Sequence, residues 1–338
     1  MNHLPAESAP DAPTDAPTDA LPEAPVDVIA RMRAEIEKAL VGQQVVVEQV
    51  LIALLAAGHV LIEGVPGLGK TLLVRALSRA FGGQNGRIQF TPDLMPSDVT
   101  GHAIYDSQTR KFEVRKGPVF TNLLLADEIN RAPAKTQAAL LEVMQERRVT
   151  IEGNAFATDR PFMVLATQNP IDQDGTYPLP EAELDRFLFK ILIDYPTLED
   201  ETQMVRLVTN GRLADQLDVE MISPVLDPQA VVALQEVVAN ITVDASVLDY
   251  AVRVTRATRE VVGFERGAGP RASIALIRAA RACALLSGRD FVVPDDVKRI
   301  ALPVLRHRVR ISADLEIEGA QADTVLGRLL NDVDAPRA

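Results

Sequence analysis

The stretch Gly64-Val65-Pro66-Gly67-Leu68-Gly69-Lys70-Thr71 has the spacing of a phosphate-binding loop: Gly, four residues, then Gly-Lys-Thr. An apolar run at 59–63 precedes it, and apolar residues at helical spacing follow from Leu72. Strand, glycine loop and helix N-terminus together turn backbone N–H groups and the positive end of a helix dipole toward one point. We expect all of residues 64–72 (Gly64, Val65, Pro66, Gly67, Leu68, Gly69, Lys70, Thr71 and Leu72) to bind nucleotide. Lys70 would reach the β- and γ-phosphates and Thr71 would place its hydroxyl on Mg²⁺. The alternative is a glycine turn without a ligand.

The composition restricts the class of protein. The 338 residues suffice for two domains, and 35 Lys and Arg against 47 Asp and Glu give a net charge of −12. This balance argues against a general nucleic-acid binder. The single cysteine, Cys283, excludes an intrachain disulfide, and the sequence contains no apolar run long enough to span a membrane. We therefore expect a cytoplasmic protein without membrane insertion.

Residues 1–26 are rich in Ala, Pro, Asp and Thr. The first 27 residues contain six acidic side chains and no Lys or Arg. Such a segment cannot bury enough apolar surface to offset its ordering entropy. We expect a disordered acidic tail.

A second group of candidate residues follows the apolar run Leu123-Leu124-Leu125-Ala126. Asp127 and Glu128 come directly after this expected strand, and carboxylates are costly at such a place unless they are used. Ligands of open α/β sheets bind at this edge. We expect Asp127 to hold Mg²⁺ and Glu128 to orient and deprotonate the attacking water. The alternative is a pair of surface acids that begin a loop.

Two polar residues follow later expected strands. Asn169 comes after the apolar strand at 161–167, where it could reach a γ-phosphate or the attacking water, or only satisfy loop backbone. Arg186 precedes the strand at 188–195. It could form a surface ion pair or enter the nucleotide site of a neighbouring subunit.

Two hairpins are expected in the first half of the chain, at about 101–117 and 148–157. The first alternates Phe112 and Val114 with charged residues and is expected to contact a partner. The second, with Gly153-Asn154 as its turn, is either an ordinary connection or a loop that faces a client.

From residue 196 onward the strand pattern largely disappears and helices are expected, which suggests a separate helical domain. We therefore divide the chain into 1–26, 27–196 and 197–338. Within the last part, Gly267-Ala268-Gly269-Pro270-Arg271 opens an Ala-rich helix. Arg271 in its first turn is unfavourable for the helix dipole unless an anion binds there; otherwise its stem covers apolar surface.

Two further features complete the pattern. Gly42-Gln43 interrupts the helical stretches that precede the glycine loop, either as a helix C-cap or as a backbone contact to an adenine base. The four histidines show no metal-ligand spacing, so no zinc site is expected.

Taken together, these motifs resemble those of AAA+ ATPases with a hairpin in the second helix, and most closely the MoxR family. The most specific runs are Asp127-Glu128-Ile129-Asn130-Arg131-Ala132-Pro133 and Leu179-Pro180-Glu181-Ala182-Glu183-Leu184-Asp185-Arg186-Phe187. The resemblance covers roughly residues 28–330. Gly269 departs from it, because relatives often carry Ser before Pro-Arg.

The resemblance implies an α/β fold: an AAA+ P-loop domain with a five-stranded parallel sheet between helices, plus a C-terminal all-α lid domain. It implies ATP and Mg²⁺ as ligands, with Asn169 as first sensor, Arg271 as second sensor in cis and Arg186 as arginine finger in trans. Arg131 is a weaker candidate at the subunit boundary. A homo-hexameric ring, a partner with a von Willebrand factor A domain and client protein complexes are also implied. A nucleic-acid motor or loader and a chelatase-like metal-insertion subunit are the alternatives.

Overall fold

The computed structural model describes residues 23–65, 67–169, 175–209 and 219–336. Most of the expected tail and Pro66 therefore lie outside the described residues. None of the helices within these ranges combines the length and apolar character needed to cross a membrane.

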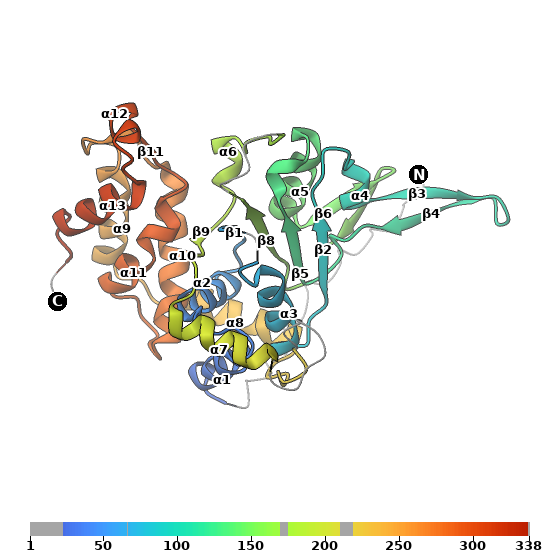
Figure 1. Ribbon diagram of the computed structural model, residues 1–338, viewed down its shortest axis with the longest axis horizontal. Coiled ribbons are helices and arrows are strands. Elements are labelled where there is room, and N and C mark those ends of the chain that lie inside the picture. The colour runs from blue at the N-terminus through green and yellow to red at the C-terminus, as the bar shows by residue number, and fades with distance from the viewer. Residues whose placement is uncertain (1–22, 66, 170–174, 210–218, 337–338) are drawn as a thin grey trace, which may run out of the picture.

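A five-stranded parallel sheet forms the centre of the molecule (Figure 1). Its strands lie in the order β2-β5-β8-β1-β9, with every neighbouring pair parallel. All five strands are short, and four of them are mostly apolar, as expected for strands covered on both faces, whereas the edge strand β2 is largely polar. The predicted five-stranded parallel sheet is thus confirmed. The bounds are β1 (Val60–Glu63), β2 (Asn85–Gln89), β5 (Leu123–Asp127), β8 (Met163–Gln168) and β9 (Phe189–Leu192).

Side chains of the sheet alternate between two apolar cores. In β5, Leu123 and Leu125 pack with the helices that precede β2 and with the C-terminal helices, whereas Leu124 and Ala126 pack with the helix that follows β5. This period of two places helices on both faces. The helices of this part are α1 (Pro25–Glu37), α2 (Gln44–Leu55), α3 (Lys70–Ala80), α4 (Pro96–Thr100), α5 (Ala134–Glu146), α6 (Glu181–Leu184) and the 3-10 turn η1 (Ile129–Arg131).

Two antiparallel hairpins extend from this core. The first, β3 (Gly101–Asp106) with β4 (Lys111–Lys116), projects away from the sheet in Figure 1. The second pairs β6 (Arg148–Ile151) with β7 (Asn154–Ala157). Its turn is Glu152-Gly153, one residue earlier than predicted, and both residues have positive φ (49° and 78°). The prediction of a turn at Gly153-Asn154 is therefore wrong, because Asn154 pairs with Ile151 in the antiparallel ladder.

The C-terminal part is helical, and α9 to α13 lie beside the β9 edge of the sheet, on the side opposite the first hairpin (Figure 1). A two-stranded ribbon, β10 (Phe264–Arg266) with β11 (Arg310–Ile311), interrupts the helices. The prediction of an all-α lid missed this ribbon. The helices are α7 (Leu198–Thr209), α8 (Pro228–Asn240), α9 (Ala245–Ala257), α10 (Pro270–Leu286), α11 (Pro294–Leu305), α12 (Ala313–Ile317) and α13 (Ala322–Asp332).

Candidate active site

The glycine loop joins the end of β1 to the start of α3. Gly67 and Gly69 have φ of 86° and 77°, and Gly69 is the N-cap of α3. A Cβ at Gly67 would meet nothing within 4 Å, so the left-handed backbone, rather than lack of space, requires glycine there. The loop therefore presents backbone N–H groups at the positive end of α3, as an anion site requires.

Lys70 begins α3 and is bound to the same loop. Its Nζ donates to the carbonyl of Gly64 at 2.5 Å. Partial burial lowers the pKa of Lys70, while Asp127, Glu128 and Glu63 act in the opposite direction. A partly desolvated ammonium group gains more from a nearby phosphate than a fully hydrated one does.

Asp127 and Glu128 lie at the carboxyl end of β5, and Thr167 of β8 connects them. The Thr167 hydroxyl donates to Asp127 Oδ1 at 2.6 Å and accepts the backbone N–H of Glu128 at 2.9 Å. Arg87 Nη2 donates to the other oxygen of Asp127 at 2.7 Å. The neighbouring strand thus fixes the backbone and the carboxylate at the point where the chain leaves the sheet.

The Glu128 side chain is held from two sides. Gln89 Nε2 donates to Glu128 Oε2 at 2.8 Å, and Arg131 Nε lies 3.2 Å from the same oxygen. Glu128 has a φ of 56°, a left-handed backbone that costs energy for a non-glycine residue. Such strain persists only where the surroundings enforce it, and here it turns the carboxylate into the cavity.

One cavity of about 570 Å³ brings the glycine loop and the carboxylates together. Asn169, nearly buried, also contributes to its wall. We call it the P-loop cavity; of the predicted site residues it is lined by Gly67, Gly69, Lys70, Thr71, Leu72, Asp127, Glu128 and Asn169.

Four further residues of the wall were not predicted: Arg75, Arg87, Gln89 and Thr167. Gln89 pairs in register with Asp127. Since the carboxyl ends of parallel strands meet at one edge, the position of Gln89 at the end of β2 and of Thr167 near the end of β8 was the signal that could have identified them.

Several predicted nucleotide contacts lie outside the wall of this cavity. Gln43 Nε2 donates to the carbonyl of Leu68 at 2.8 Å, which ties the loop between α1 and α2 to the glycine loop. At Gly42, with φ of 75°, a Cβ would lie 2.7 Å from Cγ of Asp200. Both observations give a structural reason for the residue type at positions 42 and 43. The contact of these residues to adenine stays a prediction. Gly64 and Val65 precede the lining residues in the loop.

Arg186 and Arg271 lie together in a different place. Arg186 Nη1 donates to Leu141 O at 3.1 Å and to Gln145 Oε1 at 2.5 Å, both on α5. Arg271 Nη1 lies 3.8 Å from Asp185 Oδ2. Neither arginine is among the described residues that line the P-loop cavity. The expectation that Arg271 acts on the nucleotide of its own chain thus finds no support in the geometry.

Both arginines line a second cavity of about 380 Å³, which we call the arginine cavity. Asp185 is the one carboxylate among the described residues of its wall, against five arginines. Burial lowers the pKa of Arg147, helped by Arg160, and lowers the pKa of Arg278, helped by Arg147. Uncompensated cations in a partly buried cavity favour an anionic ligand. The arginines are Arg147, Arg186, Arg271, Arg278 and Arg308.

A magnesium ion fits the donor set of the P-loop cavity. Thr71 and Asp127 line the same cavity, and among the described residues no group of three or more His, Cys, Asp and Glu could hold a metal ion by itself. Mg²⁺ is commonly bound by one or two protein oxygens together with substrate phosphates. The site matches that pattern only with a nucleotide present.

Comparisons with known proteins agree with this geometry. Residues 59–189 match the family model "ATPase family associated with various cellular activities (AAA)", and residues 256–329 match "AAA lid domain". Chaperone MoxR1 of Mycobacterium tuberculosis is 46% identical over 93% of this chain and 84% of its own. Protein MoxR of Methylorubrum extorquens is 34% identical over 87% and 91%, respectively. The crystal structure of a Cytophaga hutchinsonii protein assigned as an ATPase superposes with a TM-score of 0.85, at 40% identity, over 93% of this chain and 96% of that one.

Proposed function

The chain belongs to the MoxR family of AAA+ ATPases, and we propose that it hydrolyses ATP with Mg²⁺ at the boundaries between its own copies in a ring, most simply a hexamer. The observation that carries this proposal is the separation of the two cavities. The P-loop cavity holds the phosphate loop and the carboxylates, while Arg186 and Arg271 lie in the arginine cavity of the same chain. A second copy that presents its arginine cavity to the first would complete one site.

Each residue of the P-loop cavity then has a role in hydrolysis. The loop N–H groups and Lys70 bind the phosphates, and Glu128 takes a proton from the attacking water, which Asn169 helps to orient. Thr71 and Asp127 would hold Mg²⁺, which when bound neutralises charge on the β- and γ-phosphate oxygens. We keep Gly42 and Gln43 as candidates for the adenine contact.

The arginines would act on the nucleotide of the neighbouring copy. Arg186 would neutralise charge that develops on the transferred phosphoryl group, and Arg271 would contact the same phosphates from the helical part of the chain. Acting on the neighbour replaces the cis role expected for Arg271. Arg131, which pairs with Glu128 of its own chain, remains a weaker candidate at the boundary.

The proposed work is chaperone-like remodelling or maturation of client protein complexes, together with a partner that carries a von Willebrand factor A domain. The name of the M. tuberculosis relative, a chaperone, supports the first part.

We propose a domain division after residue 196, because the last strand of the sheet ends at Leu192, and the two family models match on either side. Movement of the helical part against the sheet would transmit the nucleotide state. The net charge of −12 disfavours nucleic acid as the client, and a cytoplasmic location stays a prediction.

Assembly is tested with the Glu128→Gln variant, which should bind ATP without turning it over. With ATP it should sediment as a ring of several copies, and the Lys70→Ala variant should not respond to ATP. A Glu128→Gln protein that remains a single chain at every concentration with saturating ATP would contradict the ring. In a second step, nucleotide-dependent capture of client proteins by the same variant, absent with Lys70→Ala, would test the chaperone role.

A further inference from the structure

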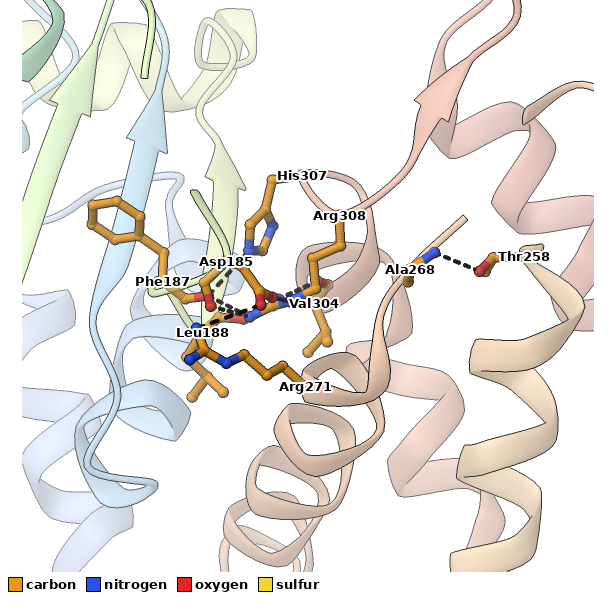
Figure 2. Close-up of polar contacts among 9 residues, drawn as sticks. All are labelled: Asp185, Phe187, Leu188, Thr258, Ala268, Arg271, Val304, His307 and Arg308. Carbon is orange, nitrogen blue, oxygen red and sulfur yellow. Dashed lines mark hydrogen bonds and ion pairs between the residues drawn. The ribbon is translucent and has the colours of Figure 1, made fainter. Parts of the chain in front are cut away.

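Arg308, in the turn after α11, uses every hydrogen-bond donor of its guanidinium group within the chain (Figure 2). Four of the five N–H groups reach one short segment of the sheet domain, residues 185–188. Nε donates to Asp185 Oδ1 at 2.7 Å and Nη1 to Leu188 O at 3.1 Å. Nη2 donates to Phe187 O at 2.6 Å and to Asp185 O at 3.3 Å. The fifth bond goes to the carbonyl of Val304 in α11.

This contact is buried and reinforced. The Arg308 side chain is only 4% exposed. Burial lowers the pKa of Arg308, and the ion pair with Asp185 opposes this shift. Nε2 of the buried His307 lies 3.0 Å from the same Phe187 carbonyl. A planar guanidinium group that donates to three carbonyls and one carboxylate of the same short segment fixes that segment in direction as well as in distance.

The segment that Arg308 holds carries Arg186. Phe187 and Asp185 flank Arg186 on both sides, so the backbone from which the arginine projects is bound to the helical part of the chain.

Arg271 is connected to the same point. Asp185 accepts from Arg308 through Oδ1, and its Oδ2 faces Arg271 at 3.8 Å (Figure 2). The loop that leads into α10 is itself anchored, because the N–H of Ala268 donates to Thr258 Oγ1 at 2.9 Å and Arg259 Nε donates to Ala268 O at 2.9 Å. The backbone before Arg271 is therefore fixed within the helical part. The Asp185 side chain, next to Arg186 in the sequence, connects Arg271 to the segment that carries Arg186.

We infer that the Asp185–Arg308 pair is a positioning device that sets Arg186, and with it Arg271, in the geometry required to act on the nucleotide of the neighbouring copy. This inference rests on the proposed function. Arg308 itself touches no nucleotide: its donors are all engaged within the chain, and it acts through Arg186. A displacement of a catalytic group by about 1 Å can cost about 10²-fold in rate, which is the scale expected when the fork is lost.

The test is a double-mutant cycle of Arg308→Met and Arg186→Ala, read out as kcat and as ATP affinity of the P-loop. Arg308→Met alone should lower kcat by about 10²-fold with unchanged ATP affinity. Added to Arg186→Ala it should cause only a small further loss, through Arg271, because the main group that it positions is gone. Asp185→Asn should follow the same pattern with a smaller loss.

Arg306→Met is the matched control. Arg306 is also a little-exposed arginine of the helical part, bound to Asp323 and to the carbonyl of Lys190 in β9, but it does not touch residues 185–188. Its loss should leave kcat nearly unchanged. If Arg308→Met does not fold, Arg308→Lys carries the same cycle, since an ammonium group keeps the charge but cannot form the fork.

The inference is overturned if Arg308→Met behaves like Arg306→Met, or if its loss multiplies with that of Arg186→Ala. A normal kcat in Arg186→Ala alone would instead contradict the proposed function. The two failures are therefore distinguishable.

Discussion

The P-loop cavity and the arginine cavity differ in how their charges are balanced. In the first, Lys70 and Arg87 face Asp127 and Glu128, and each carboxylate is hydrogen-bonded within the chain. In the second, five arginines and a single carboxylate, Asp185, share the wall among the described residues. The first has the residues proposed to bind phosphate and activate water but lacks Arg186 and Arg271, whereas the second has these cations but no glycine loop. This contrast is the basis of our proposal that one chain carries two halves of a site.

The positions of the two cavities explain why they do not merge within one chain. The P-loop cavity opens at the carboxyl ends of β1, β5 and β8, whereas the arginine cavity lies among the end of α5, the residues before β9 and the start of α10. The Asp185–Arg308 pair holds the second group to the helical part of the chain. In the proposed function, another copy therefore completes each site.

The largest effects are expected when one cation of each cavity is replaced, because the two substitutions should affect different properties. Lys70→Ala should abolish ATP binding, because it removes the charge that receives the phosphates. Arg186→Ala should bind ATP with wild-type affinity but lose about 10³- to 10⁵-fold in kcat, as for other arginine fingers. Equilibrium binding of a fluorescent ATP analogue and steady-state hydrolysis measure the two properties. Weakened ATP binding in Arg186→Ala would show that the cavities are not separate in function.

A smaller effect tests whether the P-loop cavity is preassembled by its own strands. Thr167→Val removes the hydroxyl that bridges Asp127 and the N–H of Glu128. We expect kcat to fall about tenfold with ATP affinity nearly unchanged, because the strained backbone of Glu128 loses its partner. Thr136→Val is a suitable control, since Thr136 is equally buried but bonds to Leu94 O, away from the cavity. Equal kcat values for the two variants would contradict this role of Thr167.

The smallest effect concerns His59, in the wall of the arginine cavity. It is neutral and buried: Val164 N–H donates to Nδ1 at 3.0 Å, so Nε2–H donates to Met144 O at 3.1 Å. Burial, with help from Arg147 and Arg278, lowers the pKa of His59 to about 4. The unfolded chain takes up this proton near pH 6.5 but the folded chain does not, so stability falls as the pH drops from about 6.5 toward 4.

His59→Gln should make stability less dependent on pH. By pH 5 the His59 contribution to the free energy of unfolding is about −2 kcal/mol relative to pH 7, and the glutamine variant lacks it. Urea unfolding at both pH values measures the difference, and His307, also buried with a lowered pKa, affects both proteins equally. Identical pH dependence in the two proteins would mean that His59 is not held neutral.

The features predicted best from the sequence are those that a short run of contiguous residues determines. The glycine loop and the Asp127-Glu128 pair combine their own spacing with the edge of a parallel sheet, and the structure brings both to one cavity. Gln89 and Thr167 were missed because their roles depend on strand register. Arg308 has no local pattern that indicates its role, since its partners among residues 185–188 lie more than a hundred residues earlier. The location of Arg271 depends on how the helical part packs, which residue spacing does not reveal.

The central claim, that two copies build one active site, is tested most directly with mixed rings. Lys70→Ala subunits and Arg186→Ala subunits are given different tags, coexpressed and purified over both tags. The Lys70→Ala subunit supplies its intact Arg186 to the nucleotide of an Arg186→Ala neighbour. We predict ATP hydrolysis well above the sum of the two separate variants. A mixed ring no more active than that sum would contradict the account.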